Sequence, residues 1–180
     1  GPEGDDLYFN ASVNGATYTF TVESYLCDNT TDVYQAVKNL KIGDVIDSAI
    51  DISPDGFFDE TGANIFKVGS ASYLVYCGDI YALGKHVGGD GIIDLETCDL
   101  DGNSKNDVIF SYTYKNNDKI VSSVSVFNLE TLKETFLAVE SPLPLTLERN
   151  EKGQVDIFGD SVLLATVYGE NKDILIKFID

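Results

Sequence analysis

The chain has 180 residues and a formal net charge of −18, because 30 acidic residues outnumber 12 basic ones. This balance excludes the basic surface that nucleic acid requires, and an anionic membrane surface would repel it. No apolar run reaches the roughly 20 residues that a membrane-spanning helix needs. A hydrophobic content of 43% therefore predicts a soluble, folded protein with a sizeable core.

The first six residues do not resemble the rest of the chain. The sequence contains no methionine, and Gly1-Pro2 is typical of the scar that a tag-removing protease leaves. The polar residues that follow are typical of a linker. We therefore assign residues 1–6 to a scar and linker, and we expect residues 7–180 to form a single domain.

The first half of the domain contains a predicted hairpin and a predicted helix. Residues 7–13 and 16–22 alternate between apolar and polar, and the Asn14-Gly15 pair between them favours a type I′ turn. Apolar residues at helical spacing then predict one short helix over residues 31–41. Residues 44–59 fit either a short helix or an irregular strand.

The second half consists of short alternating segments that are separated by Gly, Asp or Asn turns. The predicted strands are residues 65–68, 73–77, 80–83, 92–96, 108–114, 120–127, 135–139, 145–148, 155–158, 162–168 and 174–178. Turns are expected at 116–118, 150–153 and 169–172. The predicted fold class is mainly β with one short α-helix and antiparallel sheets, arranged as a sandwich or a curved sheet, with propeller-like blades as the alternative.

One loop carries the residue pattern of a metal site. Asp99, Asp101, Asn103, Lys105 and Asp107 occupy positions 1, 3, 5, 7 and 9 of a nine-residue segment. Calcium takes six to eight oxygen ligands, and a loop that curls around the ion presents alternate residues to it. We expect side-chain oxygens from the four Asp and Asn residues and the main-chain carbonyl of the lysine to bind Ca²⁺. The simpler interpretation is a surface turn, since Asp, Asn and Gly favour turns for local reasons.

The sequence around this loop resembles a known family. An EF-hand or a dockerin would continue into a helix, but here a strand pattern follows the loop. The order strand, Asp-x-Asp-Gly-Asn-x-x-x-Asp loop, strand instead resembles the calcium loop of FG-GAP/VCBS repeats, over residues 92–128. In such repeats the position of Ser104 is often glycine. The resemblance implies a structural calcium ion that ties the loop.

The three cysteines permit at most one disulfide. We expect Cys27, Cys77 and Cys98 to be reduced core residues, and Cys77 with Cys98 is the pair to test otherwise. No Cys and His spacing predicts a zinc site, and His86 is the single histidine.

The sequence is compatible with two further kinds of site. Asp94 and Glu96 lie two residues apart on a predicted strand, as in the carboxylate pair of a glycoside hydrolase. Tyrosines 73, 76 and 81, or 112 and 114, are candidates for an exposed sugar-binding platform, although packing between strands is the simpler interpretation.

These observations favour a binding role over catalysis. We expect a non-catalytic, calcium-stabilised, extracellular binding or spacer module of a bacterial surface protein, which binds an unidentified protein or glycan and is a monomer. The alternative is a small acidic hydrolase that uses a carboxylate pair.

Overall fold

The computed structural model describes residues 6–13, 16–23, 40–42, 45–47, 50–68, 71–77, 79–84 and 91–180. The chain divides into two compact units, Gly1–His86 and Val87–Asp180, and each is described by itself. The expectation of a single domain over residues 7–180 stays a prediction.

The first sheet of the first unit begins with the predicted hairpin. Its strands, paired in the order β1-β2-β3-β4, are β1 (Asp6–Val13), β2 (Ala16–Glu23), β3 (Leu40–Ile42) and β4 (Val45–Asp47). The hairpin is confirmed, because β1 and β2 pair from Val13 with Ala16 to Asp6 with Glu23. The Asn14-Gly15 turn lies outside the described residues.

The predicted helix over residues 31–41 is wrong at its end. Residues 31–39 lie outside the described part of the chain, but Leu40 and Lys41 belong to β3. Both residues pair with β4, and Lys41 also pairs with Thr19 of β2. Pairing with two neighbouring strands outweighs the helical spacing here, because local propensity is a weak determinant of structure.

The second sheet of the first unit includes a short helix between its first two strands. In the segment 44–59, which fits either a short helix or an irregular strand, residues 45–47 and 50–51 form strands and the helix begins only at Phe57. The elements are β5 (Ile50–Asp51), α2 (Phe57–Thr61), β6 (Ala63–Val68), β7 (Ala71–Tyr76) and β8 (Asp79–Leu83), and the strands pair in chain order. Gly56 and Gly62 flank the helix at φ 79° and 74°, a conformation that glycine adopts without steric cost. The helix buries Phe57, beside a sheet whose β6 and β7 contribute buried residues such as Ile65 and Leu74.

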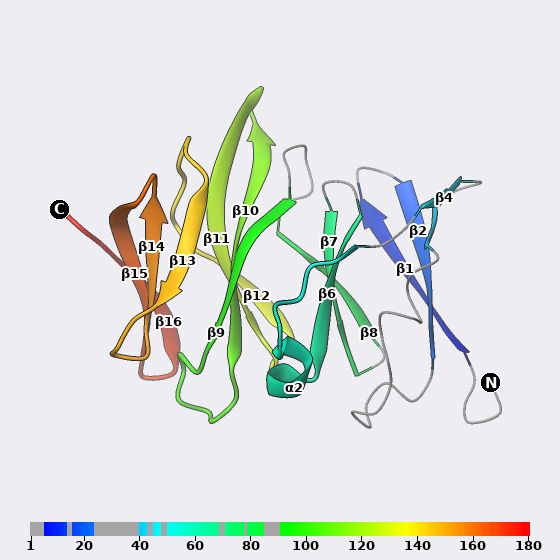
Figure 1. Ribbon diagram of the computed structural model, residues 1–180, viewed down its shortest axis with the longest axis horizontal. Coiled ribbons are helices and arrows are strands. Elements are labelled where there is room, and N and C mark those ends of the chain that lie inside the picture. Colours follow the sequence, from blue (N-terminus) through cyan, green and yellow to red (C-terminus); the bar gives the residue numbers. More distant parts are fainter. Residues whose placement is uncertain are drawn as a thin grey trace. The chain divides into compact units, whose positions relative to one another are not determined.

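The second unit consists of two four-stranded antiparallel sheets in which the strands pair in chain order (Figure 1). The first sheet is β9 (Gly91–Cys98), β10 (Asp107–Asn116), β11 (Lys119–Asn128) and β12 (Lys133–Phe136). The second is β13 (Leu145–Arg149), β14 (Val155–Gly159), β15 (Val162–Glu170) and β16 (Asp173–Phe178). Eleven strands that the sequence predicts from residue 65 onward are therefore confirmed within a few residues.

The two sheets of the second unit share one hydrophobic core. Sheet β9–β12 and the segments that follow β9 and β12 contribute Cys98, Leu100, Ile109, Val124, Val126, Leu137 and Val139, and sheet β13–β16 contributes Leu145, Leu147, Val155, Ile157, Ala165 and Val167. Hydrogen bonds also join the sheets: Ser111 Oγ donates to the Leu145 carbonyl at 2.6 Å, and the Leu147 N–H donates to Asp94 Oδ2 at 2.8 Å. This packing fixes the position of the β9–β10 loop relative to sheet β13–β16.

The predicted fold class, mainly β with antiparallel sheets, is confirmed. Each described sheet has four strands in up-and-down order, which is also the strand order of a propeller blade. No helix in the described part of the chain is long and apolar enough to cross a membrane. Cys77 and Cys98 are free; Cys98 is buried as expected, whereas Cys77 is exposed.

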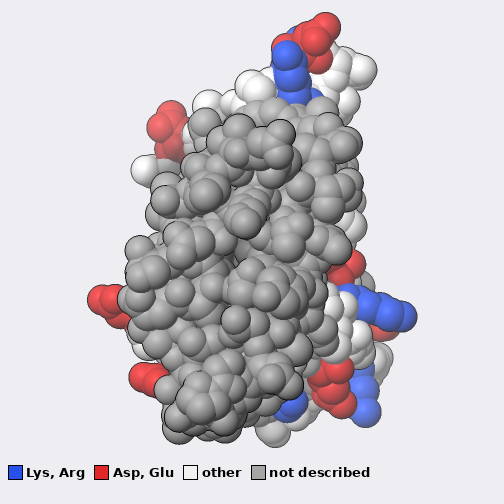
Figure 2. Space-filling model, turned by 90° about the vertical axis from the view of Figure 1, so that its right-hand side faces the viewer, with Lys and Arg blue, Asp and Glu red and all other residues white. Residues whose placement is uncertain are grey.

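Among the described side chains that Figure 2 shows, Asp and Glu lie at several separate points, and Lys or Arg lies beside some of them.

Candidate metal centre

The structure brings the three predicted aspartates of the β9–β10 loop together. Asp99, Asp101 and Asp107 each offer a carboxylate oxygen, and these oxygens lie within 4.8 Å of one another. The first two residues follow β9, and Asp107 begins β10, so the two strands carry the carboxylates to the same point. The predicted spacing therefore produces the predicted proximity.

The side-chain carboxylate of Asp99 organises the loop by binding main-chain N–H groups. Its Oδ1 accepts hydrogen bonds from the N–H groups of Gly102 at 2.9 Å and Asn103 at 3.1 Å, and its Oδ2 accepts one from Ser104 at 2.9 Å. Gly102 has φ 75° and Ser104 has φ 69°. The loop thus turns sharply around the Asp99 carboxylate.

Asp107 is the buried carboxylate of the three, with 1% of its surface exposed. Its Oδ2 accepts a hydrogen bond from the Leu100 N–H at 2.9 Å. The pKa of Asp107 is raised to about 6, mainly by burial and to a smaller extent by the charges of Asp101 and Asp99, while the Leu100 hydrogen bond acts in the opposite direction. A buried carboxylate with two carboxylates beside it is stabilised by a cation.

Two residues that the sequence analysis did not single out hold the loop from outside. Asn128 Nδ2 donates to Asp101 Oδ2 at 2.9 Å, and Asn103 Nδ2 donates to Glu130 Oε2 at 2.6 Å. Asn128 is the last residue of β11, and Glu130 follows that strand. Each lies 27 residues after the loop residue that it contacts. No local pattern relates them to the loop, so the pairing of β10 with β11 was needed to find them.

The two remaining predicted ligands, Asn103 and Lys105, are hydrogen-bonded to each other within the loop. Asn103 Oδ1 accepts a hydrogen bond from the Lys105 N–H at 2.8 Å, so the amide group of Asn103 is oriented within the loop. Lys105 is exposed. Among the described residues, no lysine or arginine forms an ion pair with any of the three aspartates. The arrangement offers hard oxygen donors without a protein cation, which is the chemistry that Ca²⁺ or Mg²⁺ requires.

Gly169 of β15 lies directly against the loop. A Cβ atom added to Gly169 would lie 1.6 Å from the Leu100 carbonyl oxygen and 2.6 Å from its carbonyl carbon. Leu100 is the residue whose N–H binds Asp107. Sheet β13–β16 therefore supports the base of the loop through a main-chain contact that only glycine permits.

The conformation of Ser104 predicts a stabilising substitution. Its φ of 69° costs a residue other than glycine about 1 kcal/mol. The hydrogen bond from the Ser104 N–H to Asp99 does not involve the serine side chain, so glycine can form it too. Ser104→Gly is expected to raise the free energy of unfolding by about 0.5 kcal/mol, after the larger entropy of glycine in the unfolded chain is allowed for. Urea denaturation measures this change, and a loss of stability would contradict it.

The carboxylate pair of the alternative interpretation is engaged in main-chain contacts. Asp94 Oδ1 accepts from the Leu95 N–H at 3.0 Å and Oδ2 accepts from Leu147. Burial raises the pKa of Glu96, while the charge of Arg149 lowers it. Arg149 itself donates two hydrogen bonds to the Thr97 carbonyl. Asp94 thus joins the two sheets of the unit.

The tyrosines of β10 do not form an exposed platform. Tyr112 is 2% exposed and Tyr114 is 5% exposed. Their ring centroids are 5.8 Å apart, and Phe110 lies 5.7 Å from Tyr112. In the first unit Tyr73 is fully buried, and Tyr76 and Tyr81 are partly buried. The structure therefore buries Tyr112, Tyr114 and Tyr73, and the ring contacts of Tyr112 run along β10 to Phe110 and Tyr114.

Models of known protein families do not match the sequence, and a search of curated proteins finds no match either.

Proposed function

We propose that this chain is a non-catalytic, calcium-stabilised binding or spacer module of a bacterial surface protein. The observation that carries the proposal is the group of carboxylate oxygens from Asp99, Asp101 and Asp107, which lie within 4.8 Å of one another, with Asp107 buried. A divalent cation there removes the mutual repulsion of the carboxylates and orders the loop between β9 and β10.

The donor set supports calcium over magnesium. Magnesium demands a nearly ideal octahedron and retains several waters, whereas calcium accepts six to eight oxygens in a flexible arrangement. The loop offers carboxylates, the Asn103 amide oxygen and the Lys105 main-chain carbonyl in the alternating order that the FG-GAP/VCBS resemblance implies. The surface location belongs to the same proposal and follows from that resemblance.

A structural role for the ion is supported by the contacts of the loop. Asp99 and Asp101 both accept hydrogen bonds from loop main-chain groups, and Asp101 is also held by Asn128. The ion therefore joins parts of one loop to β10. In the alternative hydrolase, Asp94 would need a free oxygen, but both of its oxygens accept main-chain hydrogen bonds.

Titration calorimetry of the chelator-treated protein with CaCl₂ tests the proposal. We expect one calcium ion per chain and binding at least tenfold weaker for MgCl₂. Asp99→Asn is expected to weaken calcium binding at least tenfold, because it removes one charge from the donor set. Asp118→Asn is the matched control, since Asp118 is an exposed acid in the β10–β11 turn, and it should leave binding unchanged. The absence of calcium binding, or an equal loss in both variants, would overturn the proposal.

A further inference from the structure

The two faces of sheet β13–β16 differ in composition. The face that packs against β9–β12 presents the apolar residues of the shared core. The residues that alternate with them along each strand point to the opposite face. A row of four paired residues crosses all four strands on that face: Glu148, Asp156, Thr166 and Lys177. A face of this composition does not repeat the apolar packing of the core.

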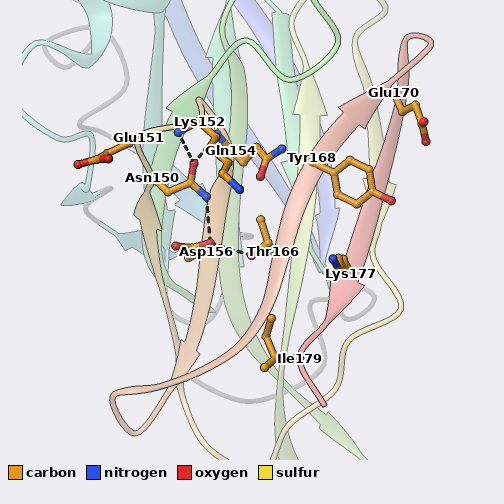
Figure 3. Close-up of a pocket in the computed structure, with 10 residues that line it drawn as sticks. All are labelled: Asn150, Glu151, Lys152, Gln154, Asp156, Thr166, Tyr168, Glu170, Lys177 and Ile179. Carbon is orange, nitrogen blue, oxygen red and sulfur yellow. Dashed lines mark hydrogen bonds between the residues drawn. The ribbon is translucent and has the colours of Figure 1, made fainter.

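A cavity of about 700 Å³ lies over this polar face (Figure 3). Its size is within the usual range of small-molecule sites, about 300 to 1,000 Å³. Asp156 is fixed at its centre, because its Oδ1 accepts hydrogen bonds from Thr166 Oγ1 at 2.8 Å and Asn150 Nδ2 at 3.1 Å. The Asn150 side chain is fixed in turn, since its Oδ1 accepts from the N–H groups of Lys152 and Gln154.

Tyr168 supplies an aromatic surface to the same cavity. It lies two residues after Thr166 on the same face of β15, and Lys177 lies nearby on β16 (Figure 3). Tyr168 is partly buried and Lys177 is exposed. Within the described part of the chain, neither the Tyr168 hydroxyl nor the Lys177 ammonium group has a hydrogen-bond or ion-pair partner. Both groups are available to a ligand.

The cavity is nearly neutral in a protein of charge −18. Its lining includes three acids, Glu151, Asp156 and Glu170, and two lysines, Lys152 and Lys177. A cationic ligand would favour a more acidic site, and an anionic polymer would favour a basic one. Hydroxyl groups, which donate and accept, complement a mixture of carboxylates, amides and ammonium groups.

We propose that the outer face of sheet β13–β16 binds a neutral glycan, with Tyr168 stacking on a sugar ring and Asp156 and Lys177 binding its hydroxyl groups. A sugar ring has an apolar face that packs on an aromatic ring and polar edges that form hydrogen bonds. This inference rests on the proposed function, because it names the ligand class of the non-catalytic binding module.

An array of immobilised neutral, sialylated and sulfated oligosaccharides, probed with the full chain, tests the inference. We expect binding to neutral glycans, and calorimetry with the best-bound neutral oligosaccharide then compares variants. Tyr168→Ala is expected to weaken binding about tenfold or more, and Tyr168→Phe, which keeps the ring, less than threefold. Phe136→Ala is the matched control: Phe136 is 52% exposed on β12, outside the cavity, and its removal should leave binding unchanged.

Three results would overturn the inference: no glycan bound on the array or at millimolar concentration in saturation-transfer NMR, a preference for sialylated or sulfated glycans, or a dimer that disappears in Tyr168→Ala. Circular dichroism confirms that each variant is folded. The calcium titration is performed on the same protein without glycan. Calcium binding without glycan binding removes this inference alone, whereas Tyr168-dependent glycan binding without calcium binding removes the metal site alone.

Discussion

Saturating calcium is expected to raise the melting temperature of the second unit by about 10 °C relative to the protein in chelator. A ligand at 100 times its dissociation constant stabilises the folded state by about 2.7 kcal/mol, and each kcal/mol raises the melting temperature of a domain of about 100 residues by about 4 °C or more. The physical source is the buried Asp107 carboxylate, which lies beside Asp99 and Asp101. Differential scanning calorimetry with calcium and with chelator measures the shift.

Asp101→Ala is expected to abolish this shift, since it removes one carboxylate and the acceptor of the Asn128 hydrogen bond. Asp118→Asn again serves as the control and should respond to calcium as the unchanged protein does. An identical melting curve with calcium and with chelator would contradict the prediction.

Asp107→Asn distinguishes the metal-free protein from the calcium-bound protein more sharply than Asp101→Ala does. In chelator this variant is expected to be more stable than the unchanged protein by about 1 kcal/mol at pH 7, because a pKa near 6 means that ionised Asp107 is unfavourable when buried. Its amide oxygen can still accept the Leu100 N–H. In calcium the order reverses, because the ion loses a charged ligand. A variant that is less stable in both conditions would show that Asp107 has only a packing role.

The same group gives the metal-free protein a definite pH dependence. The folded state binds the Asp107 proton more tightly than the unfolded state does, since its pKa is raised from 3.8 to about 6. Stability relative to Asp107→Asn is therefore highest below about pH 4, and it is lost as the pH rises from about 4 through 6. Chelator-treated samples of both proteins, unfolded in urea across this range, reveal the difference in slope.

The strands from residue 65 onward were predictable because their chemistry is local. In β10, for example, the sequence places Val108, Phe110 and Tyr112 on one face, and all three are buried. The turn at residues 116–118 was equally readable, and Asn117 and Asp118 adopt φ 49° and 65°, which Asn and Asp tolerate. Local pattern and final structure agree within a few residues for the eleven strands predicted from residue 65 onward.

The short elements near residues 40–61 were less predictable because tertiary pairing decides them. Lys41 has neighbours at helical spacing but pairs with Ile46 in β4. The helix α2 has only five residues and depends on Gly56 and Gly62 at its ends. A helix of this length has little intrinsic stability. It is also too short to show the hydrophobic period that normally identifies a helix.

The proximity of the three aspartates in the β9–β10 loop was predictable, but the residues that support the loop were not. Asp99, Asp101 and Asp107 lie close in sequence, and their spacing alone indicates their proximity. Asn128 and Glu130 reach the loop only through the pairing of β10 with β11. The cavity beside Tyr168 was missed for the same reason, since the residues that form it come from separate strands.

Gly169 shows most clearly what a sequence pattern cannot reveal. The sequence pattern places it in the turn predicted at residues 169–172. In the structure the turn is formed by Asn171 and Lys172, with φ 51° and 67°, and Gly169 belongs to β15. Its lack of a side chain is required by the Leu100 main chain, 69 residues earlier in the sequence.

Gly169→Ala is therefore expected to lower the free energy of unfolding by about 3 kcal/mol or more. The added Cβ would lie 1.6 Å from the Leu100 carbonyl oxygen, a main-chain atom that moves only if the strand or the loop moves. Overpacking of this kind costs about 1 to 3 kcal/mol even where side chains can adjust. Urea denaturation measures the loss.

Gly159→Ala is the matched control, because Gly159 also lies in a strand of the same sheet. There the added Cβ would lie 2.8 Å from Leu164 Cδ1, the flexible end of a side chain that can turn away, so the expected loss is about 1 kcal/mol or less.

The two variants should also differ in calcium binding. Displacement of Leu100 moves the N–H that holds Asp107, so Gly169→Ala is expected to weaken calcium binding at least tenfold, and Gly159→Ala should leave it unchanged. Equal stability losses in the two variants would contradict the main-chain contact. A stability loss in Gly169→Ala with unchanged calcium affinity would show that β15 supports the fold of the unit but not the metal loop.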